Sequence, residues 1–287
     1  MMKKIKTKII DYINKNIGIM FPKPEDEHFL DKQYTVIPGT IRRKPDYDDA
    51  WLFALSRKAQ NILDIGCNIG QATMNMLHEN NNLEEIILVD PNPNALMQAA
   101  YNLFLNHEMV KARFLCSFVA DKQDKKIKFY TIGKGAAGSM YPGHAKSAAK
   151  RDSHYLVPTT TIDAISKKFD FIPDLIKIDT EGAEASVLMG AKETARQQRA
   201  KIFVEMHSQP ELPMNKNAEL IIDWCQKYNY KAWYLKDKNL LQSPGQIANR
   251  GRCHLLLLPE FIPFPDYLSP ISQGSKIEEV NFIQEQQ

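Results

Sequence analysis

The sequence has no long apolar run and little excess of charge of either sign. Its longest run of leucine, Leu255 to Leu258, is far shorter than the roughly 20 apolar residues that a membrane-spanning helix needs. The 37 Lys and Arg against 34 Asp and Glu give a formal charge of +3, whereas nucleic-acid binding needs basic residues concentrated on one face. We therefore expect no integral membrane segment and no nucleic acid partner.

Cysteine is scarce, and the four that occur are far apart. They show neither the paired spacing of a zinc site nor the ladder of a small disulfide-rich domain; they are Cys67, Cys116, Cys225 and Cys253. We expect free thiols and a cytoplasmic protein. The basic start, residues 1–10, lacks a continuous signal-peptide core; its isoleucine spacing predicts an amphipathic helix, packed on its own domain or lying on a membrane surface.

Several catalytic motifs are missing. No Gly-x-Ser-x-Gly elbow and no P-loop ending in Gly-Lys-Ser/Thr occurs, which excludes the common hydrolase and nucleotide triphosphatase classes. The dinucleotide-binding pattern Gly-x-Gly-x-x-Gly is absent as well.

Short apolar runs alternate with helical patterns from residue 61 to residue 258, which predicts an α/β fold with a mostly parallel, doubly wound sheet. The expected strands are 61–65, 85–90, 113–115, 175–179 and 202–206, and the expected helices are 71–80, 94–106, 184–190 and 218–228. Two later runs, 230–235 and 253–258, have no long helix between them, which favours an antiparallel pair at the sheet edge.

Outside this pattern we expect an N-terminal helical extension over residues 1–55, a main domain over 56–262 and a mobile, polar tail over 263–287. An inserted hairpin is expected at about 127–160. Its tip, residues 133–154, is long enough to be either a lid or disordered. If it is a lid, His144, Lys146, Lys150 and Arg151 would meet an anionic acceptor.

The segment Asn61-Ile-Leu-Asp-Ile-Gly-Cys-Asn-Ile-Gly70 predicts a strand, a ligand-binding turn and a helix. Gly66 and Gly70 allow the backbone to approach a ligand closely. Asp64 stands where a dinucleotide loop has its first glycine, and its charge suits a ligand with ammonium and sulfonium groups. S-adenosylmethionine is such a ligand.

Asp90 ends the next expected strand, where a carboxylate can accept both hydroxyls of a ribose. A plain glycine turn, with Asp90 capping the helix that follows, is the structural alternative. An NAD-dependent oxidoreductase shares the strand, loop and acid but is disfavoured by Asp64. A non-catalytic module that only binds the cofactor also remains open.

Two further segments extend the pattern: Leu175-Ile-Lys-Ile-Asp-Thr-Glu-Gly-Ala-Glu184 and Phe203-Val-Glu-Met-His207. Together with the cofactor loop, they resemble the FkbM family of S-adenosylmethionine-dependent methyltransferases over about half the chain. The resemblance implies a Rossmann-like class I fold, a seven-stranded sheet with an antiparallel edge strand, and helices on both faces. It also implies O-methylation of a hydroxyl on a sugar, glycan or secondary metabolite.

The resemblance also implies which residues hold the cofactor. Around the methionine part it places Asp64, Gly66, Asn68 and Gly70. On the ribose it places Asp90 and Asn92, and near the adenine Ser117 or Asp121.

Methyl transfer requires an aligned acceptor oxygen and a group that manages one proton. Asp179 and Glu181 follow the fourth expected strand, and Glu205 and His207 share one side of the fifth. We expect Asp179, Glu181 and His207 to be catalytic. A divalent metal on Asp179, Glu205 and His207 is a minority alternative, and acids that stabilise a helix start, with a structural histidine, are another.

Overall fold

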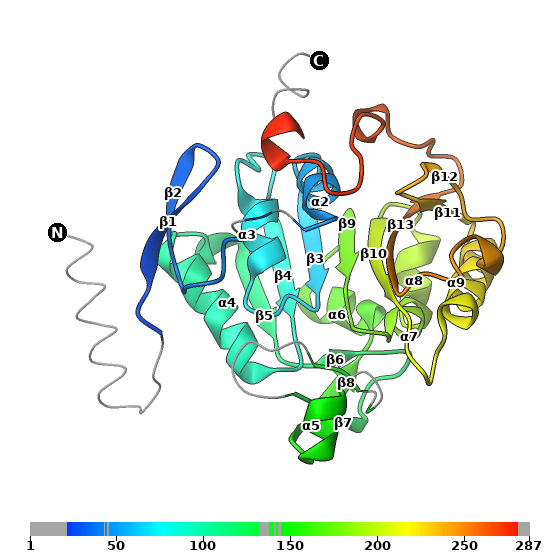
Figure 1. Cartoon of the computed structure of the whole chain (residues 1–287), viewed down its shortest axis with the longest axis horizontal. Helices are drawn as coiled ribbons and strands as arrows, with labels where there is room; N and C mark the ends of the chain where they lie inside the picture. The colour runs from blue at the N-terminus through cyan, green and yellow to red at the C-terminus, as the bar shows by residue number, and fades with distance from the viewer. Residues whose placement is uncertain are drawn as a thin grey trace.

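The computed structural model describes residues 22–42, 44, 46–131, 138–140, 142 and 145–280. Figure 1 shows a central sheet between layers of helices. The strands are β1 (Glu25–Phe29), β2 (Lys32–Val36), β3 (Asn61–Ile65), β4 (Glu85–Val89), β5 (Ala112–Leu115), β6 (Phe118–Val119), β7 (Lys126–Tyr130), β8 (His154–Thr160), β9 (Leu175–Ile178), β10 (Lys201–His207), β11 (Tyr230–Tyr234), β12 (Asn239–Leu240) and β13 (Arg252–Pro259).

The helices of the described residues include eight α-helices and three short 3-10 turns. They are α2 (Asp49–Ser56), α3 (Gln71–Leu77), α4 (Pro93–Leu105), α5 (Lys146–Lys150), α6 (Ile162–Phe169), α7 (Glu184–Met189), α8 (Lys192–Arg196), α9 (Met214–Tyr228), η1 (Met109–Lys111), η2 (Pro244–Gln246) and η3 (Asp266–Leu268). None of these is long and apolar enough to cross a membrane.

The main sheet has eight strands in the order β12-β11-β13-β10-β9-β3-β4-β5. Strands β5, β4, β3, β9 and β10 run parallel to one another, which confirms the α/β class. Three antiparallel pairings beside them make the sheet mixed. The sheet is not the seven-stranded one we expected, because the two-residue strand β12 adds an eighth strand.

The antiparallel pair expected from residues 230–235 and 253–258 is confirmed as β11 and β13. However, β13 is not an edge strand, and that part of the prediction is wrong. Strand β13 lies between β10 and β11 and runs antiparallel to both. Leu255 to Leu258 are all fully buried in it. A strand covered on both faces carries a continuous apolar run, which explains why this segment does not alternate as an exposed edge strand would.

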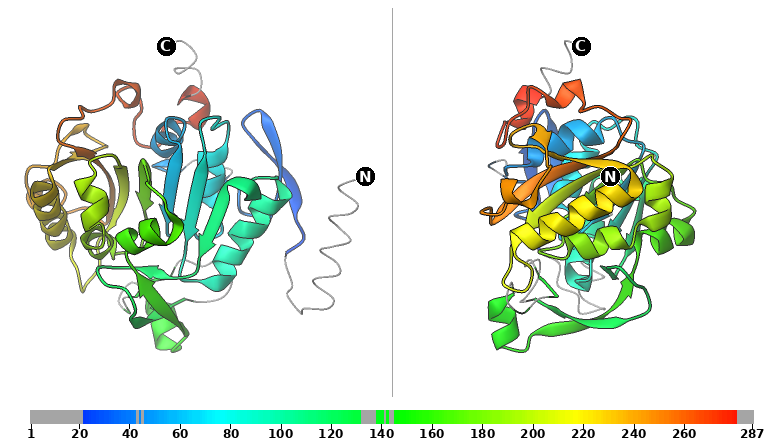
Figure 2. Two further views of the ribbon diagram at one scale, coloured as in Figure 1. Left: turned by 180° about the vertical axis from the view of Figure 1, so that it is seen from behind. Right: turned by 90° about the vertical axis from the view of Figure 1, so that its right-hand side faces the viewer.

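Alternate residues of the strands feed two separate cores. Leu63 and Leu255 point into one core, and Ile62 and Leu256 point into the other. The first core is covered by α6, α7, α8 and α9, and the second by α2, α3 and α4, as the two views of Figure 2 show. The prediction of helices on both faces of a doubly wound sheet is confirmed.

The predicted insertion is a hairpin. Strands β7 and β8 pair antiparallel, and β6 pairs parallel to β8 to make a small three-stranded sheet. In Figure 1 this sheet and α5 lie below the main sheet. The insertion therefore lies at one end of the strands of the main sheet and does not form a second domain.

The described part of the N-terminal extension is not all helical, so that prediction is wrong for residues 25–36. These residues form the antiparallel hairpin β1–β2. Tyr34 and Val36 are buried at a two-residue spacing, the period of a strand. The side-chain amide of Asn106, which follows α4, accepts the Thr35 N–H over 3.0 Å and donates to the Thr35 carbonyl over 2.9 Å. The expected basic helix at residues 1–21 lies outside the described residues.

As far as residue 280, the C-terminal segment packs onto the second core. The prediction of a mobile tail is therefore wrong for these residues. Leu268, Ile271, Ile277 and Val280 are all buried in it, and the indole N–H of Trp51 donates to the Ile271 carbonyl over 3.2 Å. These apolar residues follow no regular period, so the sequence pattern gave no sign of their burial. Residues 281–287 lie outside the described part of the chain.

Candidate active site

A cavity lies where β3, β4 and β9 end. Because parallel strands present their carboxyl ends at one edge, residues distant in sequence meet there. Its lining is Ile65, Gly66, Asn68, Val89, Asp90, Pro91, Asn92, Ser117, Phe118, Val119, Phe129, Gly138, Asp179, Thr180 and Glu181. Seven of the predicted site residues are in this set: Gly66, Asn68, Asp90, Asn92, Ser117, Asp179 and Glu181.

The turn after β3 is closed around Gly66. Its φ is +80°, and a Cβ placed there would lie 1.8 Å from the carbonyl oxygen of Asp179. No side chain fits in that space, so the cofactor loop and the loop after β9 meet through bare backbone. Gly70, with φ +87°, begins α3 and packs on Ala99. Gly70 does not line the cavity, so its predicted contact with the cofactor is not supported.

Asp90 joins the loops that follow β3 and β4. Its carboxylate accepts the backbone N–H of Asn68 over 2.9 Å and that of Asn92 over 2.7 Å. Burial raises the pKa of Asp90 to about 6, although these two hydrogen bonds act in the opposite direction. Asn92 also caps α4, accepting N–H groups of Asn94 and Ala95. The acid at the end of β4 therefore faces the cavity and also fixes its wall.

Three buried polar atoms of the lining have no hydrogen-bond partner within the described chain. They are Asn68 Oδ1, Asn92 Nδ2 and Thr180 Oγ1. Buried polar groups are nearly always hydrogen-bonded, so such atoms indicate a bound ligand with donors and acceptors of its own. S-adenosylmethionine, with its ammonium, carboxylate and ribose hydroxyls, fits this lining.

The far side of the cavity is more apolar. Phe118 and Val119 of β6 and Phe129 of β7 line it beside Ser117, which is suited to a flat aromatic base. The Ser117 hydroxyl donates to the Pro158 carbonyl over 2.8 Å. No motif in the sequence marks these aromatic residues, and they were not predicted. Asp121 is exposed and lies outside the lining, so its predicted contact with adenine is not supported.

Asp64 lies beneath the loop and not in the cavity. It is 0% exposed; its Oδ2 accepts the hydroxyl of Thr73 over 2.7 Å, and its Oδ1 lies 3.4 Å from Lys177 Nζ. The predicted direct contact between Asp64 and the ligand's cation is therefore not supported. The cation that Asp64 pairs with is Lys177.

Lys177 is a functional residue that we did not predict. Burial opposes its charge, but Asp64 and Asp179 raise its pKa above the ordinary value. Its Nζ lies 3.5 Å from Asp179 Oδ2. Burial raises the pKa of Asp179 to about 7, and Lys177 limits that rise. The sequence does contain a signal for Lys177, which lies between two isoleucines of a buried strand. Buried lysines are almost always paired, so this position indicates a nearby carboxylate.

His207 is enclosed by three carboxylates. Its Nδ1 lies 3.0 Å from Glu184 Oε1, and its Nε2 lies 3.5 Å from both Glu181 Oε2 and Glu205 Oε1. Burial lowers its pKa, but the bonds to Glu184 and Glu205 outweigh this and raise it to about 11. The ring is thus an imidazolium at neutral pH. A charged His207 that does not line the cavity cannot act as a base, although it can fix Glu181.

Glu184 is the second residue that the sequence reasoning left without a site role. It is fully buried and accepts the N–H of Gly182 over 2.8 Å and Nδ2 of Asn217 over 3.0 Å, besides facing His207. Every oxygen of this carboxylate is thereby held. Glu184 is therefore the anchor of the imidazolium.

Asp179, Glu205 and His207 do lie together, with ligand atoms within 4.8 Å of one another. However, cations already neutralise these carboxylates: Lys177 lies beside Asp179, and Arg252 Nη1 lies 3.1 Å from Glu205 Oε1. A protonated imidazole has no lone pair for a metal. The arrangement is typical of an ion-pair network, and it can position an acceptor or move a proton.

The insertion contributes Phe129 and Gly138 to the cavity wall. Lys146 and Lys150 on α5, and Arg151 after it, are exposed. His144 lies outside the described residues. Whether the tip closes over the acceptor stays a prediction.

The methyltransferase FkbM domain model matches residues 64–232. Among solved structures, the chain is similar to the methyltransferase FkbM from Methylobacillus flagellatus, with 14% identity and a TM-score of 0.46, covering 69% of this chain and 43% of that one. It is also similar to M. jannaschii TYW2 in complex with AdoMet, with 10% identity and a TM-score of 0.43, covering 83% and 86%.

A putative caffeoyl-CoA O-methyltransferase from Staphylococcus aureus is similar at 12% identity and a TM-score of 0.40, covering 75% of this chain and 86% of that one. No curated protein matches the chain. The family match spans more than half of the chain and includes the end of β3, Asp90, Asp179 and His207. The chain spans less than half the length of the FkbM structure from Methylobacillus flagellatus. It belongs to the methyltransferase FkbM domain family.

Proposed function

We propose that the enzyme transfers the methyl group of S-adenosylmethionine to a hydroxyl oxygen of a sugar, glycan or secondary metabolite. The observation that carries this proposal is the position of Asp179. Its side chain is 28% exposed, it lines the cavity, and its backbone packs on Gly66 of the cofactor loop. With a pKa of about 7, its carboxylate is suited to accept a proton near neutral pH.

The cofactor is held by the loops after β3 and β4. Gly66 and Asn68 lie along the methionine part, and Asp90 and Asn92 accept and donate to the ribose hydroxyls. Ser117 lies beside the adenine, whose faces contact the apolar wall. Asp64 and Gly70 do not contact the cofactor. Asp64 pairs with Lys177, and Gly70 caps the start of α3.

When bound, S-adenosylmethionine supplies an electrophilic methyl group on a sulfonium centre. With the cofactor bound, Asp179 would accept the proton of the acceptor hydroxyl as its oxygen takes the methyl group and the S–C bond breaks to leave a neutral thioether. Glu181 would orient that hydroxyl from the same loop. His207 is a positioning residue, since its imidazolium lies 3.5 Å from Glu181 Oε2 and is fixed from behind by Glu184. Lys177 keeps a share of Asp179 ionised.

The chain's own residues already supply positive charge to this site, so we propose that no divalent metal takes part. A small-molecule or glycan acceptor is favoured over nucleic acid by the weak charge bias of +3. A cytoplasmic location is supported by four cysteines that are all free. An NAD-dependent oxidoreductase, our alternative from sequence, is not supported, because the family is one of methyltransferases.

The test is mass spectrometry of cell extracts incubated with the enzyme and methyl-labelled S-adenosylmethionine. We expect label on a hydroxyl oxygen of one small molecule or glycan, and none in extract incubated without enzyme. Label on nitrogen or carbon, or label confined to nucleic acid, would contradict the proposal. A chain that binds the cofactor but labels nothing in any extract would support the non-catalytic alternative.

A further inference from the structure

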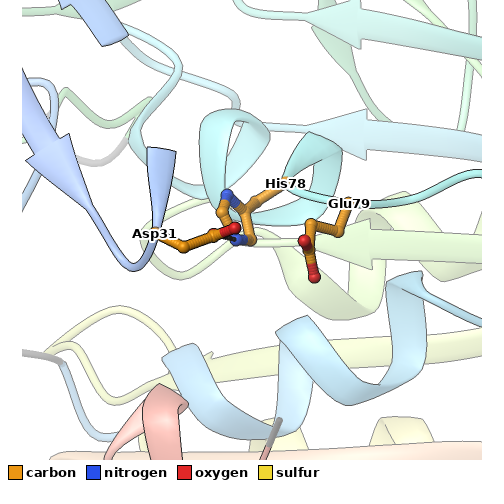
Figure 3. Close-up of side chains that lie close together, drawn as sticks. All are labelled: Asp31, His78 and Glu79. Carbon is orange, nitrogen blue, oxygen red and sulfur yellow. Dashed lines mark ion pairs between the residues drawn. The ribbon is translucent and has the colours of Figure 1, made fainter. Parts of the chain in front are cut away.

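A second cluster of ligand-type side chains lies away from the cofactor cavity. The cofactor loop precedes α3, whereas His78 and Glu79 follow its last residue, Leu77. The third member, Asp31, is in the turn between β1 and β2. Figure 3 shows the Asp31 carboxylate reaching the His78 ring with Glu79 beside them. The atoms that these three residues offer lie within 4.8 Å of one another.

The His78 ring is held rigidly. It is 0% exposed, and Phe29 meets it edge-on at a centroid distance of 5.1 Å. Its Nδ1 lies 2.9 Å from the hydroxyl of Tyr34. In metal sites the other ring nitrogen of a ligating histidine is almost always fixed by such a hydrogen bond. Tyr34 therefore gives His78 the orientation that a metal ligand requires.

The other nitrogen, Nε2, has no hydrogen-bond partner within the described chain, and it lies 3.3 Å from Asp31 Oδ1. If Tyr34 accepts the Nδ1 proton, Nε2 turns a lone pair toward a carboxylate oxygen. Two such acceptors repel each other unless a cation lies between them.

We propose that Asp31, His78 and Glu79 bind a divalent transition metal ion, with Zn²⁺ as the best fit. Zinc takes imidazole and carboxylate ligands at about 2.0–2.2 Å in a tetrahedral arrangement, which places neighbouring ligand atoms about 3.4 Å apart. The spacing of 3.3 Å between Nε2 and Asp31 Oδ1 agrees with this. Calcium and magnesium prefer shells of oxygen ligands, so the buried imidazole argues against them.

Glu79 can offer an oxygen to the ion. Its Oε2 lies 3.4 Å from Arg57 Nη1, and one oxygen of the same carboxylate lies within 4.8 Å of the other ligand atoms. The Asp31 side chain is 65% exposed, so water can fill the remaining position on the ion. Because Asp31 belongs to the hairpin and the other two ligands follow α3, the metal would fasten the hairpin to the main domain.

The experiment is a Zn²⁺ titration of the chelator-treated full chain by calorimetry, with melting temperature as a second readout. We expect one ion per chain at this site and a raised melting temperature. Substitutions that only reorient ligands weaken metal binding by about 10–100-fold, so loss of a ligand in Asp31→Asn should weaken it by about 100-fold or more. His78→Gln should weaken Zn²⁺ binding by a similar factor. If His78→Gln fails to fold, Asp31→Asn alone tests the site, because the Asp31 side chain is exposed.

Two controls separate this site from others. Glu25→Gln removes an exposed carboxylate of the same hairpin and should leave Zn²⁺ affinity unchanged. His207→Gln removes the histidine of the active-site cluster and should also leave it unchanged. The proposal is overturned if wild type does not bind Zn²⁺, if Asp31→Asn binds as wild type does, or if only His207→Gln abolishes binding.

Discussion

His207 Nδ1 lies 3.0 Å from Oε1 of Glu184, a carboxylate that is fully buried at the start of α7. The pair joins the end of β10 to the loop that carries Glu181. Because the pKa of His207 is raised from 6.5 to about 11, the pair is ionic at neutral pH, and its contribution to stability depends on pH.

The sign of that dependence follows from proton linkage. The contribution is fully present below the pKa of the unfolded chain, near 6.5, and is lost as pH rises toward the folded value of about 11. We expect the stability advantage of wild type over His207→Gln to fall with rising pH, at most by about 1.4 kcal/mol per pH unit. Urea unfolding of both chains at several values between pH 7 and pH 9 measures this. Parallel stability curves would show that His207 is neutral in the folded chain.

Asp90→Asn should weaken S-adenosylmethionine binding. The substitution removes the charge that accepts the ribose hydroxyls, and it turns an amide toward the N–H of Asn68 or Asn92. A hydrogen bond to a charged group is worth about 1.5–3 kcal/mol, or about 10–150-fold in Kd. Calorimetric titration checks this, with the exposed Asp121→Asn as the control. Equal affinity of Asp90→Asn and wild type would mean that Asp90 only fixes the loops that follow β3 and β4.

The packed C-terminal segment predicts a stability effect far from the site. Ile271→Ala leaves a cavity in the second core, where its carbonyl also accepts from Trp51. Such truncations cost about 2–5 kcal/mol, which denaturant unfolding resolves. Phe261→Ala, at a side chain that is 71% exposed, is the matched control and should change little. An unchanged midpoint for Ile271→Ala would restore the reading of this segment as a mobile tail.

The parallel part of the fold was predictable because each strand there is an unbroken apolar run followed by a turn and a helix. The hairpin β1–β2 was not, since Glu25, Asp26 and Glu27 give it no apolar run. The place of β13 was missed for a different reason. A local pattern shows that a strand is buried on both faces, but only the long-range pairing with β10 and β11 decides where it lies.

The site was predictable where the chain needs a special backbone or ends a strand in an acid, as at Gly66, Asp90 and Asp179. Asp64 was misread because its partner, Lys177, is 113 positions away and reaches it only through the pairing of β3 with β9. The role of Glu184 was hidden in the same way, since His207 comes to it from β10. Side chains that act through such partners need the tertiary structure to be identified.

The most direct test of Asp179 as the proton acceptor is the single-turnover rate of methyl transfer by Asp179→Asn, measured with the acceptor that labelling identifies. Loss of a general base lowers such a rate by about 10²–10⁴-fold, and we predict a loss of that size with S-adenosylmethionine affinity unchanged. We also predict that the wild-type rate rises with pH through about 7, as Asp179 ionises, and that the variant lacks this rise. A variant that transfers methyl at the wild-type rate, with the same pH profile, would contradict the account.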